Sequence, residues 1–180
     1  MTPSVRALGV AATLLSVFST VSPAQSRQKL SVELSGSLLY SPLKDPGFDF
    51  THRLGYEAQA RYTFSRLSLG VGYQRSKSFV YPATPNTWLE LSFGFVEPRL
   101  VLAVGDRTAG YASGRLGFGK LICSVECVPG KTVATYGAGG GVLVVLSRRV
   151  SADLGGQVFG VSGEFTRGFV LLRGGFAVGL

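Results

Sequence analysis

Polar and apolar residues alternate along residues 29–40, which read KLSVELSGSLLY. Successive side chains of a strand point to opposite faces, so the apolar residues from Leu30 to Tyr40 share one face, and Glu33 shares the other with serines. Seven further runs have the same period of two, and together they predict an all-β chain of eight strands. These runs are residues 53–64, 67–74, 88–104, 108–121, 132–147, 150–160 and 169–180.

The connections between these runs alternate in length. Short connections are expected at residues 65–66, 105–107 and 147–149. This regularity predicts an antiparallel up-and-down β-barrel with one plain rim and one decorated rim, and strands of roughly 10 residues suit a tilted membrane crossing. Long connections are expected around residues 41–52, 76–87 and 122–131, and one of intermediate length around residues 160–167.

The polar rows of the strands indicate which face looks inward. They hold five acidic and five basic residues, padded with glycine and serine. Equal numbers of opposite charges suit a narrow shared interior, so we expect the apolar rows to face lipid. A soluble barrel with the two faces exchanged is the alternative. The ten charged residues are Lys29, Glu33, Glu57, Arg61, Glu90, Glu97, Arg99, Arg115, Asp153 and Arg173.

An eight-stranded barrel has an interior just wide enough for its own side chains, and an unpaired charge in a dry lumen is costly. Counting residues from the strand ends places Glu33, Glu57 and Glu97 at depths similar to those of Arg115 and Arg173. We therefore expect these side chains to pair and to fill the lumen.

The run at residues 88–104 changes parity. Its apolar residues occupy odd positions from Leu89 to Phe95 and even positions from Leu100 to Val104. A change of parity inside one strand needs an extra residue, so this run predicts a β-bulge near Glu97.

The N-terminal residues have the pattern of a secretory signal peptide. Arg6 precedes an uncharged apolar run from Ala7 to Val21, and small residues precede a cleavage site after Ala24. The run is shorter than the roughly 20 residues of a membrane-spanning helix, which is the alternative. We expect residues 1–24 to be a cleaved signal and residues 25–180 to form one barrel domain in the bacterial outer membrane.

The mature chain would carry a net charge of +7, from 17 basic and 10 acidic residues. Charged residues make up 16% of the sequence, against about 25% in ordinary soluble domains. An exported basic chain meets membrane anions and lipopolysaccharide rather than nucleic acid. Predicted contacts to lipid phosphates on the long-loop side are Lys44, Arg53, Arg75, Lys77, Lys120, Lys131 and Arg167.

The chain resembles the small eight-stranded bacterial outer-membrane barrels of the OmpA and OmpX type over residues 28–180. The final residues, GGFAVGL, resemble the C-terminal signal read by the barrel assembly machinery, although Leu180 stands where phenylalanine is usual. The resemblance implies an outer-membrane location and an assembly partner. Fold alone does not imply a function.

Features that could carry catalysis are weak. The glycine-rich stretch at residues 136–142 has no Lys-Ser/Thr after it, and Glu97 and Arg99 have a simpler use as an interior ion pair. His52 is the one histidine, in a long loop. We expect no catalytic site, cofactor or metal. The predicted function is a structural or surface-interaction barrel with an unidentified surface partner; a small-solute channel and a lipid A-modifying enzyme are the alternatives.

Cys123 and Cys127 are predicted to form a disulfide at the tip of the third long loop, because export is oxidising and two thiols alone under-ligate a metal. Mass spectrometry of the unreduced protein should show no free thiol, and two free thiols would contradict the pairing. The bond closes a very short loop, so replacing both cysteines with serine should barely change barrel stability.

Overall fold

The computed structural model describes residues 29–40, 52–79, 88–123, 131–162 and 167–180. It confirms the predicted all-β barrel: each strand is antiparallel to the next, and β8 pairs with β1 to close the sheet. No helix within the described ranges is long and apolar enough to cross a membrane. The strands are β1 (Leu30–Tyr40), β2 (His52–Phe64), β3 (Leu67–Phe79), β4 (Trp88–Val104), β5 (Thr108–Cys123), β6 (Lys131–Val145), β7 (Val150–Ser162) and β8 (Arg167–Gly179).

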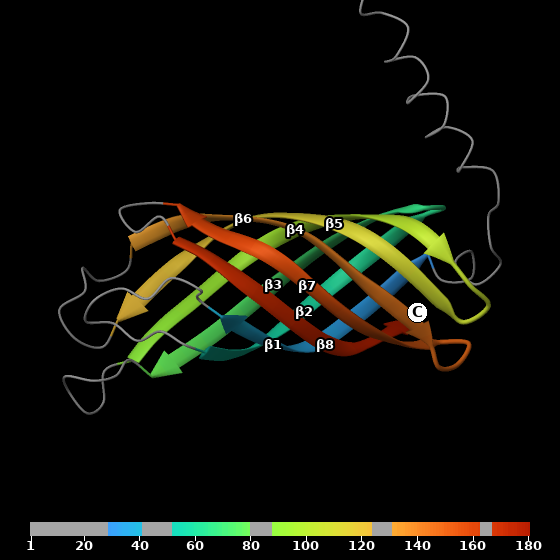
Figure 1. Ribbon diagram of the computed structural model, residues 1–180, viewed down its shortest axis with the longest axis horizontal. Helices are drawn as coiled ribbons and strands as arrows, with labels where there is room; N and C mark the ends of the chain where they lie inside the picture. The colour runs from blue at the N-terminus through green and yellow to red at the C-terminus, as the bar shows by residue number, and fades with distance from the viewer. Residues whose placement is uncertain (1–28, 41–51, 80–87, 124–130, 163–166) are drawn as a thin grey trace, which may run out of the picture.

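The three short connections lie together at one end of the barrel, here called the turn end, where the C-terminus also lies (Figure 1). The opposite end is called the loop end. The strands are tilted relative to the barrel axis (Figure 1), as closure of a sheet requires. Ser65 begins the two-residue turn between β2 and β3 with a φ of 56°. The proposed signal peptide lies outside the described residues, as do most of the long connections.

Burial along β1 determines which face looks inward. Glu33 is 1% exposed, whereas its neighbour Leu34 is 64% exposed. The same alternation holds along β2, where Glu57 is buried and Tyr56 is exposed. The apolar rows therefore form the outer wall. Aromatic side chains are exposed on this wall toward both ends, as in membrane barrels: Tyr40 and Tyr136 toward the loop end, and Tyr62, Phe64 and Phe176 toward the turn end. Tyr73 is also exposed on this wall, at the middle of β3.

The predicted bulge near Glu97 is wrong. Val96 and Glu97 pair in unbroken register with Val71 and Gly70 of β3, and the register of β4 with β5 shifts only further along, between Val101 and Ala103. Odd-numbered residues of β4 therefore face the lumen over most of its length. Consequently Phe93 and its odd-numbered apolar neighbours, which were expected to face lipid, are buried inside the barrel.

These β4 residues can point inward because the lumen is apolar near the loop end. They join buried residues of other strands in one cluster, here called the apolar plug, in which the rings of Phe93 and Phe159 stack with centroids 5.3 Å apart. The space is tight: a Cβ atom added at Gly72 would lie 2.7 Å from Cζ of Phe95. The plug consists of Leu39, Leu91, Phe93, Phe95, Val133, Phe159, Val161, Phe169 and Leu171.

The outward face predicts a depth-dependent cost for charge. Val71 and Leu67 are similarly exposed on the outer face of β3, but Leu67 adjoins the turn, whereas Val71 lies deeper. Val71→Arg should lower the free energy of unfolding by about 2–4 kcal/mol, because the guanidinium must enter hydrocarbon. Leu67→Arg is the control and should cost about 0–1 kcal/mol. Denaturant titrations in lipid vesicles measure both, and equal losses would contradict a lipid-facing wall.

Candidate functional site

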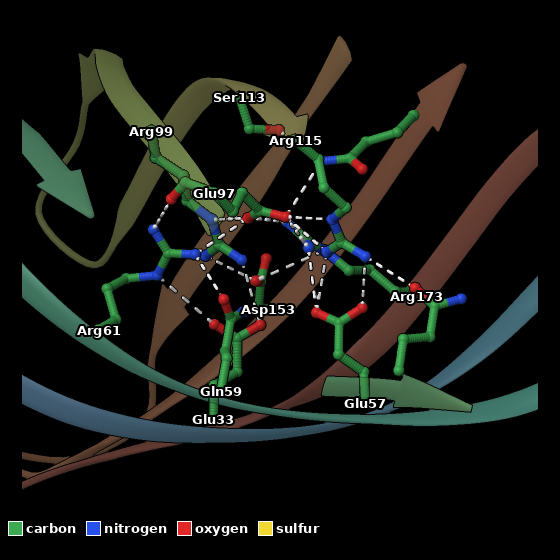
Figure 2. A network of polar contacts seen from close by, with 12 residues as sticks. Glu33, Glu57, Gln59, Arg61, Glu97, Arg99, Ser113, Arg115, Asp153 and Arg173 are labelled. Carbon is green, nitrogen blue, oxygen red and sulfur yellow. Dashed lines mark hydrogen bonds and ion pairs between the residues drawn. The ribbon is translucent and has the colours of Figure 1, made fainter. Parts of the chain in front are cut away.

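Eight buried charged side chains meet in the middle of the lumen, where six strands contribute to one group, here called the ion network (Figure 2). Alternation along these six strands places the eight charged residues on the inner face, and barrel closure brings them to a common depth. The network has four carboxylates and four guanidiniums, so its formal charges cancel. Its members are Glu33, Glu57, Arg61, Glu97, Arg99, Arg115, Asp153 and Arg173.

Glu97 is the centre of the network, and all four arginines contact its carboxylate (Figure 2). Its Oε1 accepts hydrogen bonds from Arg61 Nη2 at 2.9 Å and Arg99 Nε at 2.7 Å. Arg173 reaches both carboxylate oxygens, at 2.7 and 2.9 Å, and Arg115 donates to Oε2. Glu97 is fully buried, so this single negative charge holds four cations together.

Glu57 binds the side of the network that adjoins the apolar plug. Arg115 donates to both of its oxygens, at 2.8 and 3.0 Å, in a bidentate pair. Arg173 Nη1 makes a further contact of 3.3 Å to the same carboxylate. The guanidinium of Arg115 also lies 3.9 Å from the ring centroid of Phe95, which belongs to the plug. Ionic and apolar parts of the lumen are therefore in direct contact.

Glu33 and Asp153 bind the opposite side. Arg99 lies 3.2 Å from Glu33 and 2.8 Å from Asp153, and Arg61 Nε lies 3.8 Å from Glu33. Tyr111 donates its hydroxyl proton to Asp153 Oδ1 at 2.7 Å. Glu57 and Glu97 thus contact both Arg115 and Arg173 as expected, while the ion pairs of Glu33 are with Arg61 and Arg99.

Neutral side chains that the sequence analysis did not single out complete the network. Gln59 accepts from Arg61 at 2.8 Å, Gln74 accepts from Arg115 at 2.7 Å, and Gln157 donates to Glu97 at 3.2 Å. All three glutamines are buried. Gln59 and Gln157 share the inward parity of the charged residues on β2 and β7, and Gln74 shares that of the buried serines Ser68 and Ser76 on β3. This parity is the signal that could have identified them.

Glu90, assigned from sequence to the lumen, points to the outer side of β4 instead, although it is only 7% exposed there. The unbroken register of β4 gives it the parity of exposed Val96, and Lys77 lies directly opposite it on β3. Its carboxylate pairs with Arg75, with Nε 2.7 Å from Oε1. Lys29 is exposed at the turn end. The predicted balance of five acids and five bases therefore becomes four of each inside the lumen.

Three of the predicted lipid-phosphate contacts can be located. Arg75, Lys77 and Lys120 are exposed on the outer wall of β3 and β5 near the loop end, and Ser92 of β4 lies between Arg75 and Lys120 in the register. The other four, Lys44, Arg53, Lys131 and Arg167, have side chains outside the described part of the structure.

The remaining sequence-derived sites lie largely outside the described residues. This is the case for Cys127 and for the side chains of Cys123 and His52, so the disulfide stays a prediction. Within the described ranges, no group of three or more His, Cys, Asp or Glu side chains could hold a metal ion.

Comparisons with known proteins identify the fold. No family model matches the sequence, and no curated protein matches it. Solved structures do match. Neisserial surface protein A, NspA, superposes with a TM-score of 0.64 and 16% identity, covering 84% of this chain and 96% of its own. This chain has the fold of an eight-stranded outer-membrane barrel.

Two further structures support the same fold. Ail, the attachment invasion locus protein of Yersinia pestis, matches with a TM-score of 0.55 and 12% identity, over 83% of this chain and 95% of its own. The N-terminal β-barrel domain of Pseudomonas aeruginosa OprF matches with a TM-score of 0.51 and 14% identity, over 83% of this chain and 98% of its own. Another Ail structure, with a TM-score of 0.51, 12% identity and coverage of 82% and 96%, is a complex with the heparin analogue sucrose octasulfate.

Removing the central carboxylate should destabilise the barrel strongly. Glu97→Gln leaves four arginines facing three carboxylates in a closed interior, and breaking a buried ion network of this kind costs about 3–5 kcal/mol. Glu90→Gln is the matched control, because that carboxylate, although itself buried, has a half-exposed arginine as its partner outside the lumen, so its loss should cost clearly less than Glu97→Gln. Denaturant titrations of the refolded barrels measure both.

A second change separates charge imbalance from lost packing. Adding Arg173→Gln to Glu97→Gln restores equal numbers of charges, so the double variant should be more stable than the sum of the two single losses predicts. Additive losses would show that the side chains act independently.

Proposed function

We propose that this chain is a non-enzymatic protein of the bacterial outer membrane that anchors in lipid and presents its loops to a surface partner. The observation that carries the proposal is the filled lumen. From the ion network to the loop end, the interior is occupied by paired charges and then by apolar side chains.

This filling argues against the main alternative, a small-solute channel. The plug places stacked phenylalanine rings, Phe93 and Phe159, between the network and the loop end. A conducting path would require the two rings to separate and the ion pairs of the network to open. An eight-stranded barrel has little room to spare inside, so solutes would have no continuous route.

The outer wall supports an anchoring role. Its apolar side chains suit lipid, and the cations Arg75, Lys77 and Lys120 are placed where they could reach phosphates of lipopolysaccharide. Glu90 neutralises part of this positive charge through Arg75, which makes Lys120 the clearest candidate. In the same proposal, the four basic residues without a described side chain add to this rim, residues 1–24 are removed on export, and the barrel assembly machinery inserts the chain.

The loops are the proposed site of partner binding. NspA is named a surface protein and Ail an attachment invasion locus protein, and Ail has been crystallised with a sulfated heparin analogue. Arg75, Lys77 and Lys120 make the described outer rim at the loop end basic. A basic rim beside the loops suits an anionic partner, so we propose a polyanionic or acidic surface ligand.

Conductance measurements test the proposal. The purified barrel in a planar bilayer should give no stable ohmic current, because the plug and the ion network close the lumen. A double variant, Phe93→Ala with Phe159→Ala, removes the stacked rings and serves as the comparison. Any current through the lumen should be larger in this variant than in the unmodified barrel. A steady current through the unmodified barrel would favour the transporter.

Cells lacking the gene provide a second readout of the same proposal. Loss of this barrel should leave the uptake of small solutes unchanged and should reduce adhesion to anionic surfaces. Impaired solute uptake with normal adhesion would contradict a surface-interaction role.

A further inference from the structure

The lumen is open at the turn end, in contrast to the closed loop end. A cavity of about 560 Å³ extends from the turn end to the ion network, and Glu33, Arg61 and Arg99 lie along its inner boundary. The ion network and the apolar plug lie beyond this boundary, so the cavity is a blind pocket rather than a channel. Its volume lies within the range of about 300–1,000 Å³ typical of small-molecule sites.

The two sides of this turn-end cavity differ in chemistry. Strands β4, β5 and β6 contribute apolar side chains, among them Val101, Ala109 and Leu143. Strands β1, β2 and β3 contribute hydroxyl groups, and Ser68 also accepts a hydrogen bond from Arg61 at 3.1 Å. A ligand in this cavity would therefore have a substantial apolar body.

The mouth of the cavity is strongly basic. Arg107 on the turn between β4 and β5 and Arg148 on the turn between β6 and β7 both line it, as does the acidic Asp106. Among the described side chains at the turn end, five are cationic and only Asp106 is acidic. Such a mouth attracts anions. The five cations are Lys29, Arg66, Arg107, Arg148 and Arg149.

We propose that the turn-end cavity binds a single-chain anionic amphiphile. The anionic head lies at the mouth beside Arg107, and the hydrocarbon chain lies along the apolar wall of β4 to β6. The opposite orientation is disfavoured, because Glu33 lines the inner boundary and its arginine neighbours already have carboxylate partners. A fatty carboxylate and a lysophospholipid-type phosphate share this chemistry. Short connections face the periplasm in such barrels, so the ligand would enter from that side.

Calorimetric titration of the full mature barrel in phosphatidylcholine nanodiscs tests the proposal, with empty nanodiscs correcting for partition into lipid. The probes are octanoate, octyl phosphate and octyltrimethylammonium, which share a chain length and differ in head group. Both anions should bind saturably and the cation should not. Tighter binding of octyl phosphate would identify the phosphate source, and tighter binding of octanoate the carboxylate source. Equal binding of the cation would overturn the proposal.

Variants locate the site. Leu143→Trp fills the cavity and should abolish binding, whereas Val142→Trp places the same side chain on the outer wall and should not affect it. If Leu143→Trp fails to refold, Ala109→Leu fills the same wall with a smaller change. Unchanged binding to a refolded cavity-filling variant would overturn the proposal.

Charge variants test the mouth. Arg107→Gln should weaken binding of both anions about tenfold, the loss of one charge-assisted hydrogen bond. Arg149→Gln is the control, because Arg149 is an exposed cation at the same end that does not line the cavity. Equal effects of the two variants would show that general rim charge attracts the anions, which contradicts a head-group contact at Arg107. None of these measurements depends on whether the barrel conducts or adheres.

Discussion

The contact of one carboxylate with four guanidiniums is the constraint on which the interior depends. Each arginine of the ion network would be costly in a closed lumen without a counter-charge, because the desolvation of an ion is repaid only by close and well-oriented partners. Glu97 touches all four and is itself fully buried. The register of β4 fixes the depth of Glu97, so it also fixes where the other strands must place their charges.

This arrangement divides the lumen along its length. The ring of Phe95 lies against the guanidinium of Arg115 and joins the ionic middle to the apolar plug. Glycines such as Gly117 leave room for this packing, since a Cβ there would lie 3.1 Å from that of Phe95. A wide polar interior would need water to satisfy its charges. Here ion pairs and stacked rings fill the narrow interior, so the middle of the lumen and its loop-end half are occupied by side chains of the barrel itself.

The sequence predicted the strands, the short turns and most inward-facing charges, because on most strands the acidic and arginine residues have a single parity. It failed on β4, where both parities contain apolar residues. Choosing between them requires knowing that Phe93 meets Phe159, and that contact depends on how distant strands are staggered in the closed barrel. Because the wrong parity was assigned to the first half of β4, Glu90 was wrongly predicted to face the lumen. The individual ion pairs could not be predicted from the sequence either, because pairing depends on the depth of each residue and the reach of its side chain as well as on parity.

The filled middle of the lumen separates the surface at the loop end from the cavity at the turn end. The loops and the cations Arg75 and Lys120 lie toward one end, and the turn-end cavity opens at the other. Between them, Glu97 and its arginines leave little freedom to rearrange, since moving one guanidinium away would expose an unpaired charge to an apolar neighbour. Loop sequences could therefore change to suit new partners without disturbing the interior. The ion network also forms a rigid inner boundary for a ligand in the turn-end cavity. The selectivity of the cavity would therefore be set by the apolar wall of β4 to β6 and by the basic mouth.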